Sequence, residues 1–484
     1  MKKNKTKGVS SMNSESRRGF IKKGAIAAAA MMTGCSPKVA EVVSERTTAA
    51  AATAPATGAV LGANDRLVVG FIGVGGQGYN AHLRSVVNLS GDDQPFHSYE
   101  YNVAGAAACD LFSVRRDRAK ATLEKGRDMK GQSGFQVQTY EDHRALLDNQ
   151  DIDAIFIGTV DHWHTQIALD ALDAGKHVYC EKPMTRYMME GFQIYDKVME
   201  TGKKFQIGSQ YCTEGKWHKA AELVQAGKIG KLVLAQDSYM RNSPDGEWNY
   251  YQIEPEMTPQ TMNWEHWLGN VHNKGDFNPE HYHRWRKYYE YCAGILGDLL
   301  AHRIHPLLIA TGNPQFPTRV ASLGTNKITR ETVGPDDRSV NDNTQLLVEF
   351  PSGLMMVIIG ATVNEQGLGQ VIRGNEATLY FGGNTVELRP ERPYADLVDQ
   401  ESFENIQPGV SVPAHIDNFF SAIRNDTTTN GNIDVAIKTQ TIISMSEMSD
   451  RLGEMLYFDE KTRKLSTGSG RNIEPISYGT LDHS

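Results

Sequence analysis

Cysteine is scarce in this chain, with five among 484 residues. The five form no CxxC pair and no Cys/His cluster with zinc spacing, so neither a disulfide framework nor a structural zinc site is expected. Because free cysteine is usually a small buried residue, we expect Cys109, Cys180 and Cys292 to be buried. The HYHRW stretch at 281–285 has two histidines, but no carboxylate or cysteine convincingly completes a ligand set. No metal site is therefore predicted.

Excess positive charge is lacking outside the N-terminus. The whole chain carries −8, and residues 1–34, with eight Lys/Arg and one Glu, carry +7, which leaves −15 on the rest. A protein with this much negative charge is repelled by the phosphates of nucleic acid, so no nucleic-acid partner is expected. The apolar content of 40% and charged content of 22% are those of a soluble globular protein. The length predicts two domains with accessory segments.

The N-terminal apolar run at 24–34 is too short to cross a bilayer, which takes about 20 residues. It follows a basic segment, as in a signal peptide. Residues Ser16–Lys22 resemble a twin-arginine signal, and Met32–Cys35 resemble a lipobox whose Cys35 would be acylated. Residues 1–35 are therefore interpreted as an export signal and 36–64 as a flexible linker. This predicts a protein of the periplasm or cell envelope that touches the membrane only through a lipid anchor.

A glycine-rich turn follows the first strongly apolar run of the body. Residues 66–72 read as a buried parallel strand, and GVGGQG at 73–78 fits the G-x-G-x-x-G pattern. Gly73 would allow the tight turn, Gly75 the approach of a pyrophosphate, and Gly78 the packing of the next helix. Asp110 ends the next predicted strand and would accept from the adenosine ribose, although it lies 32 residues past Gly78. Arg115 and Arg116 follow closely and could accommodate a 2′-phosphate, so NADP stays possible. NAD is favoured, because arginines in such a position more commonly form a solvated helix face.

Strand and helix patterns alternate through residue 208. Helices are expected at about 114–130, 166–174 and 187–200, with strands at 153–159, 176–180 and 204–208. This alternation predicts an α/β Rossmann-type doubly wound parallel sheet. Further strands are expected at 320–323, 344–350, 354–359 and 378–381.

The stretch TVDHWHTQIALDALDAGKHVYCEKPMT at 159–185 resembles the Gfo/Idh/MocA oxidoreductase family, named for glucose–fructose oxidoreductase and inositol dehydrogenase. The resemblance runs over about 66–460 and includes GILGDLLAHRIH at 294–305. It implies an NAD(P)-binding domain at 65–208 and an α+β second domain at 209–460 with a large, mostly antiparallel open sheet. The closing helices would return to the first domain, and 461–484 would be a C-terminal tail. The resemblance also suggests a homodimer or homotetramer.

The resemblance further implies the roles of individual residues. Lys182 would act in proton transfer, together with His302 and Asp298, which are four residues apart and share a helix face. Which of Lys182 and His302 is the base is left open, because the two can titrate as a pair. The residues expected at the cofactor are Gly73, Gly75, Gly76, Gln77, Gly78, Asp110, Thr159, Trp163, His164, Glu181 and Lys182. Those expected at the substrate are Tyr211, His281, His283, Arg284 and Arg286.

These features predict an oxidoreductase that transfers hydride between a sugar, cyclitol or glycoside carbon and a tightly bound nicotinamide. A first alternative is an NAD-dependent glycosidase that oxidises, eliminates and regenerates its cofactor, as suits an exported protein. A second is a non-catalytic sugar-binding lipoprotein, which the intact Lys182, Asp298 and His302 disfavour. The substrate and the carbon that is oxidised stay open.

Overall fold

The computed structural model describes residues 65–90, 94–132, 134–334 and 336–480, all within one compact unit that spans Ala54–Ser484. The predicted signal at 1–35, with Cys35, and the linker at 36–64 lie outside the described residues. Among the described residues, no helix has the length and apolar character needed to cross a membrane.

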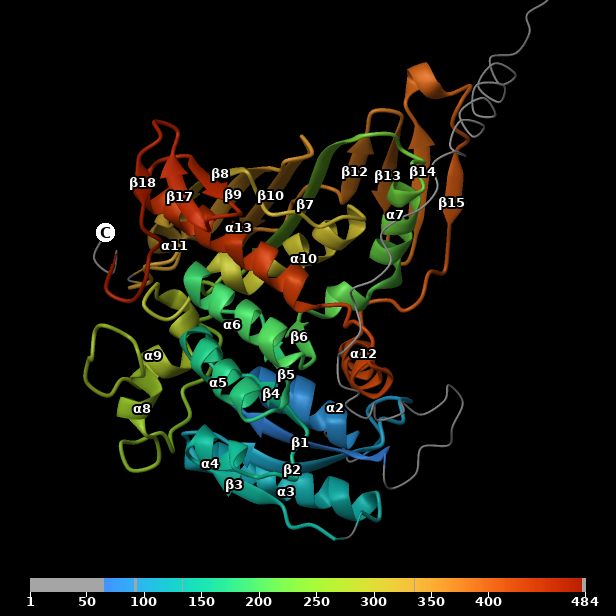
Figure 1. The fold of residues 1–484 in the computed structure, drawn as a ribbon. Coiled ribbons are helices and arrows are strands. Elements are labelled where there is room, and N and C mark those ends of the chain that lie inside the picture. Colours follow the sequence, from blue (N-terminus) through green and yellow to red (C-terminus); the bar gives the residue numbers. More distant parts are fainter. Residues whose placement is uncertain (1–64, 91–93, 133, 335, 481–484) are drawn as a thin grey trace, which may run out of the picture. The chain divides into compact units, whose positions relative to one another are not determined.

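The first sheet has six parallel strands in the order β3-β2-β1-β4-β5-β6 (Figure 1). Its strands are short and rich in Val, Ile and Ala, and β2 is buried at every position, as expected for a sheet covered on both faces. This strand order is that of a Rossmann fold, whose ligands bind where the order reverses, between β1 and β4. The strand bounds are β1 Leu67–Ile72, β2 Val103–Cys109, β3 Gln138–Tyr140, β4 Ala154–Ile157, β5 His177–Glu181 and β6 Phe205–Gly208.

Helices cover both faces of this sheet. One face packs against α2 (Arg84–Val87), α3 (Ser113–Met129) and α12 (Val412–Asn425), and the aromatic rings of Phe419 and Phe156 meet there edge to face. The other face packs against α4 (His143–Leu147), α5 (Asp161–Asp173) and α6 (Met188–Thr201). The late helix α12 therefore belongs to the first domain in space, as the resemblance implied.

The second sheet has twelve strands and is antiparallel except where β7 (Leu232–Asn242) runs parallel to β10 (Met355–Ala361). Its order is β15-β14-β13-β12-β7-β10-β9-β8-β16-β17-β18, with β11 beside β7. The four strands expected here all form, within β8 Arg319–Thr325, β9 Asn343–Glu349, β10 and β13 Ala377–Phe381. The others are β11 Val363–Asn364, β12 Val371–Gly374, β14 Val386–Pro390, β15 Glu401–Phe403, β16 Leu456–Asp459, β17 Lys464–Thr467 and β18 Asn472–Ile473. Two segments of the stretch expected as a tail, 464–467 and 472–473, thus form β17 and β18 in the sheet.

One face of the second sheet is covered by α7 (Gly215–Gln225), α10 (Ala301–Ala310) and α13 (Ile433–Leu452) (Figure 1). The helix α13 is buried along most of its length. All four cysteines among the described residues, Cys109, Cys180, Cys212 and Cys292, are free and buried. Burial raises the pKa of each thiol, to about 12 for Cys212.

Between β7 and α10, residues 243–295 leave the second sheet and run along the first domain. We call them the crossing segment; it includes α8 (Trp264–Leu268) and α9 (Pro279–His283). Its Met262 forms an isolated β-bridge with Phe112, and the Ser113 amide donates to Thr261 O at 3.0 Å. The crossing segment thereby reaches the carboxyl edge of the first sheet, where β2 ends.

Candidate functional site

The turn after β1 accepts only glycine at its two ends. Gly73 has a φ of +81°, and a Cβ there would lie 2.7 Å from the backbone of Thr159. A Cβ on Gly78 would lie 1.9 Å from Gly73 O, so the helical turn Gly78–Leu83 packs directly on the loop. A Cβ on Gly76 would meet nothing within 4 Å. The loop therefore combines a tight backbone turn with free space at Gly76, as a bound pyrophosphate requires.

Asp110 is fixed at the mouth of this loop. Its carboxylate accepts hydrogen bonds from the Val74 amide at 2.9 Å and from the Phe112 amide at 3.0 Å. Arg116 donates to the Asp110 carbonyl at 2.5 Å. Arg115 is engaged by the crossing segment, with Glu254 at 2.6 Å and the Tyr282 hydroxyl at 3.0 Å. Both arginines proposed for a 2′-phosphate thus already hold oxygen acceptors.

A cavity of about 790 Å³ extends from this loop to the second domain. Its lining joins the carboxyl ends of the first sheet's strands to β7, α10 and the crossing segment. From the first domain it includes Gly73, Gly75, Gly76, Gln77, Asp110, Thr159, Asp161, Trp163, Glu181 and Lys182. From the rest of the chain it includes Tyr239, Arg241, Tyr250, Tyr251, His283, Trp285, Arg286, Asp298 and His302.

Lys182, directly after β5, reaches across this cavity to Asp298. Its ammonium donates to Asp298 Oδ1 at 2.7 Å and to the Asp298 carbonyl at 2.5 Å. Asp298 also accepts from Arg286 Nε at 3.0 Å and from Trp248 Nε1 at 3.1 Å. Burial alone would raise the pKa of Asp298, but the charges of Lys182 and Arg286 hold that pKa well below its usual range. The carboxylate is therefore ionised and anchors three donors.

Trp248 is held in an unusual backbone conformation. It is fully buried with a φ of +67°, a left-handed conformation that bulky residues rarely adopt. Such strain persists where surrounding contacts determine it, and it is common near functional sites. Here the strained residue aims its indole N–H at Asp298.

His302 lies one helical turn after Asp298 and lines the same cavity. Its ring packs against those of Tyr211 at 5.3 Å and Tyr239 at 6.1 Å between centroids. Its Nδ1 is shielded from solvent and has no hydrogen-bond partner among the described residues. Burial and the nearby charge of Lys182 lower the pKa of His302 well below its usual value. The imidazole is therefore neutral.

Glu181 connects the β5 end to the glycine loop. It accepts from His82 at 2.7 Å and from Gln77 at 3.3 Å, and it is buried. Burial alone would raise the pKa of Glu181, but the hydrogen bond and charge of His82 and the charge of Lys182 hold it below the usual value. Glu181 and Lys182 thus point their functional groups to different partners from adjacent positions.

Asp161 is a cavity residue that the sequence analysis passed over. It opens α5, is 3% exposed, and makes no hydrogen bond through its carboxyl group within the described part of the chain. Burial raises the pKa of Asp161 to about 8, against the opposing charges of Arg286 and Lys182. A carboxyl group directly after a strand end, between Thr159 and His164, was the available sequence signal.

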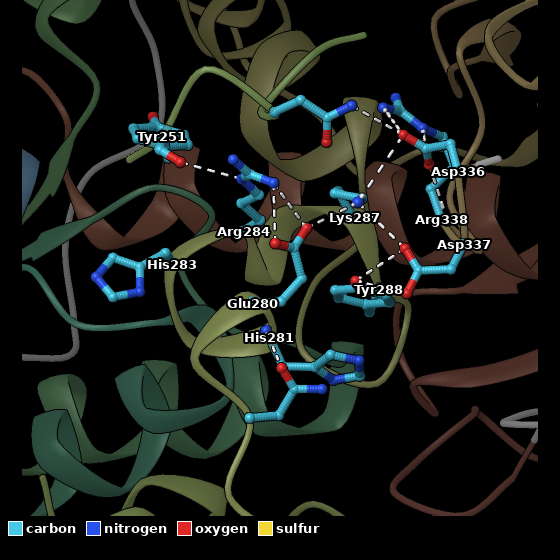
Figure 2. Close-up of polar contacts among 12 residues, drawn as sticks. Tyr251, Glu280, His281, His283, Arg284, Lys287, Tyr288, Asp336, Asp337 and Arg338 are labelled. Atoms are coloured by element: carbon cyan, nitrogen blue, oxygen red, sulfur yellow. Dashed lines mark hydrogen bonds and ion pairs between the residues drawn. The ribbon is translucent and has the colours of Figure 1, made fainter. Parts of the chain in front are cut away.

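Several predicted residues lie beside the cavity and do not line it. His164 Nδ1 donates to the Pro183 carbonyl at 2.8 Å and so supports the turn that carries Lys182. Tyr211 reaches the site only through its ring contact with His302. Figure 2 shows that Arg284 and His281 turn into a separate polar group: Arg284 pairs with Glu280 at 2.9 Å, and His281 stacks on Tyr288. His283, in contrast, lies apart from that group, lines the cavity and contacts Glu254 at 3.1 Å.

Comparison with known proteins finds two matches to one family. Residues 67–209 match the Gfo/Idh/MocA oxidoreductase family, NAD-binding Rossmann fold, and residues 246–473 match its C-terminal alpha/beta domain. The chain is 26% identical to levoglucosan dehydrogenase of Pseudarthrobacter phenanthrenivorans over 62% of this chain and 73% of that protein. It is 28% identical to an alpha-N-acetylgalactosaminidase of Shewanella oneidensis and 25% identical to an inositol 2-dehydrogenase of Salmonella typhimurium. These two matches span 39% and 55% of those proteins and 38% and 42% of this chain.

Solved structures share the fold. A levoglucosan dehydrogenase in complex with NADH and levoglucosan superposes with a TM-score of 0.59 at 18% identity, over 81% of this chain and 99% of that one. An aldose–aldose oxidoreductase from Caulobacter crescentus in complex with glycerol superposes with a TM-score of 0.56 at 17% identity, over 81% and 100%.

Proposed function

The chain belongs to the Gfo/Idh/MocA oxidoreductase family, and from that premise we propose that it transfers hydride between a carbohydrate hydroxyl carbon and a nicotinamide dinucleotide. The observation that carries this proposal is the Lys182–Asp298 contact of 2.7 Å with His302 in the same cavity as the glycine loop. The names of relatives that act on levoglucosan and inositol support a carbohydrate substrate.

The residues at the loop fit a dinucleotide. Gly73 and Gly78 allow the turn, the space at Gly76 would take the pyrophosphate, and Asp110 would accept from the adenosine ribose. When bound, the nicotinamide ring supplies the hydride acceptor or donor. Because Arg115 and Arg116 are already engaged, a 2′-phosphate would find no free guanidinium from these two, which favours NAD over NADP.

Proton transfer falls to the protein, since oxidation of a hydroxyl releases a proton along with the hydride. Neutral His302 has the lone pair needed to accept that proton. Lys182, close to an ionised Asp298, would donate to the same hydroxyl oxygen and stabilise the negative charge that develops on it. Tyr239, Trp285 and Arg286, which line the same cavity, suit a ring with one apolar face and many hydroxyls.

A second function, glycoside cleavage by oxidation and elimination, is favoured by the similarity to an alpha-N-acetylgalactosaminidase. Such a reaction would return the hydride to the product and leave the cofactor unchanged overall. The same Lys182–His302 pair would serve it, because the first step is also the oxidation of a hydroxyl.

The contacts of the crossing segment with the first domain bear on how tightly the cofactor is held. The crossing segment lies over the end of β2 and is fastened there by Arg115 with Glu254 and by Asn263, whose amide side chain donates to Glu141 at 2.7 Å. We propose that these contacts slow dinucleotide release. Together with the twin-arginine and lipobox resemblance of residues 1–35, this supports export of a folded, loaded protein to the cell envelope.

The exposed face of the second sheet supports a homo-oligomer. Leu323 is 76% exposed and Leu347 is 49% exposed, and the partly exposed Val357 and Ile359 lie on the paired strand β10. Leu347 pairs with Val357, and Gln345 stands between Leu323 and Ile359 on the neighbouring strands. We call these four apolar residues, which lie close together around Gln345, the apolar strip. A second copy of the chain would cover this strip.

The test of the activity replaces Lys182 and keeps the cofactor site. Lys182→Ala should lower turnover of a carbohydrate panel by roughly 100-fold or more, because positioned proton transfer is worth that much. The dinucleotide released by heating, measured by fluorescence after reduction, should be unchanged. Lys197→Ala, a control on the surface of α6, should match the parent protein.

Three outcomes separate the possibilities. Full activity in Lys182→Ala contradicts the assignment of Lys182. An empty supernatant from the heated parent protein contradicts cofactor retention. Turnover of an aryl glycoside without added NAD selects the glycosidase over the simple dehydrogenase.

A further inference from the structure

Three side chains of the types that bind metal ions meet beside the cavity. One ring nitrogen each of His143 and His266 and a carboxylate oxygen of Asp142 all lie within 4.8 Å of one another. Asp142 and His143 stand at the start of α4 in the first domain, whereas His266 belongs to α8 of the crossing segment. Both histidines line the cavity.

His143 is oriented as metal-bound histidines are. Its Nε2 lies 2.8 Å from the Asp170 carboxylate, which also accepts from Gln166 at 2.6 Å. A carboxylate accepts only, so Nε2 carries the proton and the lone pair is on Nδ1. That nitrogen faces Asp142 at 3.6 Å, which is too long for a hydrogen bond. A carboxylate behind a histidine commonly fixes its tautomer for metal binding.

His266 has free nitrogens on the other side. Its backbone amide is capped by Asn263, but no hydrogen bond to either ring nitrogen is found among the described residues. The ring packs against Trp163 with centroids 5.1 Å apart. Its accessible position allows it to turn toward His143 without disturbing the backbone of α8.

The distances between the ligand atoms of Asp142, His143 and His266 suit a small ion after slight rotation of the side chains. Ligand bonds of about 2.1 Å in a tetrahedron place neighbouring ligand atoms roughly 3.4 Å apart. The distance of 3.6 Å between Asp142 Oδ1 and His143 Nδ1 is close to this value. Asp142 is exposed and His266 is half-buried, so both side chains can close the remaining gap. Arg144, also exposed, lies 3.9 Å from Asp142 and would move aside.

We propose that Asp142, His143 and His266 form a site for a divalent transition-metal ion of the zinc or cobalt class. Two imidazoles and one carboxylate favour such ions over calcium or magnesium, which prefer oxygen ligands. The three ligands leave at least one position open toward the cavity. The ion would join α4 to α8 and so fasten the crossing segment to the first domain. This inference is independent of the proposed activity.

The test is metal binding to the full chain, without a histidine tag and after removal of metals by a chelator. Calorimetric titration with Co²⁺ should give one equivalent, with visible absorption bands and quenching of tryptophan fluorescence from Trp163. His266→Leu should abolish the site. Asp170→Asn, which removes only the supporting carboxylate, should weaken binding by about 10- to 100-fold.

Two further variants keep the result interpretable. Asp142→Asn removes the charge but retains the helix cap to the Arg144 amide, so the protein should fold and bind Co²⁺ more weakly. His272→Ala removes an exposed histidine of the same segment and should bind like the parent. Absence of stoichiometric binding in the parent, or equal affinity in His266→Leu and His272→Ala, would overturn the proposal.

Discussion

Three ionisable residues on the cavity wall have pKa values that move in different directions. Asp298 is held ionised by Lys182 and Arg286, while His302 is kept neutral by burial and by the charge of Lys182. Asp161, with a pKa raised to about 8, is protonated at neutral pH. Such separation of pKa values among close groups is characteristic of sites that move protons.

Asp161 should make stability depend on pH. Its pKa is near 4 in the unfolded chain and about 8 in the fold, so between these values the unfolded chain releases a proton that the fold retains. Stability should therefore fall as pH rises from 4 to 8. Asp161→Asn should remove this dependence, so its gain over the parent grows across that window to roughly 5 kcal/mol, at about 1.4 kcal/mol per pKa unit. Chemical denaturation at pH 4, 6 and 8 measures it.

Asp128→Asn, at an exposed position on α3, is the matched control and should show no such trend. A difference between Asp161→Asn and the parent that is the same at pH 4 and pH 8 would show that Asp161 is ionised in the fold.

At the scale of elements, one buried ion pair fastens the turn after β5 to α13. Arg186, four residues past Lys182, donates to both oxygens of Glu447 at 2.7 and 2.8 Å, and both side chains are almost fully buried. Arg186 also donates to the Tyr289 carbonyl in the crossing segment. The position of Lys182 thus depends on a helix that lies far along the chain.

Glu447→Gln should destabilise the fold strongly. It leaves the buried Arg186 without a counter-charge, which typically costs about 3–5 kcal/mol. Asp434→Asn removes an i,i+4 pair with Lys438 on the same helix, in which the Asp434 carboxylate is half exposed, and should cost less than about 1 kcal/mol. Urea denaturation compares the two, and equal small effects would mean that Arg186 finds another acceptor.

Signals between residues close together in the sequence best predicted the elements that line the cavity. The strand–GVGGQG–helix unit, the EKP turn and the Asp298–His302 spacing each lie within a few residues, so the sequence reveals them directly. Trp248 and the crossing segment were missed because their roles arise from contacts between distant parts of the chain. The same reason explains β17 and β18, which become strands only by pairing with the end of an existing sheet.

At the scale of the whole molecule, the apolar strip on the second sheet is the feature that supports a second copy of the chain as a partner. Its four residues belong to β8, β9 and β10, whose other face packs toward α10 and α13 (Figure 1). On β9 and β10 they alternate along the strands with the buried residues Leu346, Val348, Met356 and Ile358. An exposed apolar strip of this kind commonly marks an interface.

Leu347→Glu should therefore convert an oligomer to a monomer, because it places a charge in the middle of the strip. Leu397→Glu introduces the same change at another exposed leucine, outside the strip, and should leave the assembly intact. Light scattering coupled to size-exclusion chromatography gives the mass of each. A parent protein that is already monomeric, or a Leu347→Glu variant of unchanged mass, would contradict the proposed interface.

The four buried cysteines have a consequence for where the folded body can work. None is near enough to the surface to meet an oxidant, and their raised pKa values keep them as unreactive thiols. A body of this kind needs no oxidative maturation and is insensitive to the redox potential around it. It would keep one covalent structure whether it stays among reducing thiols or is carried, already folded, into an oxidising space.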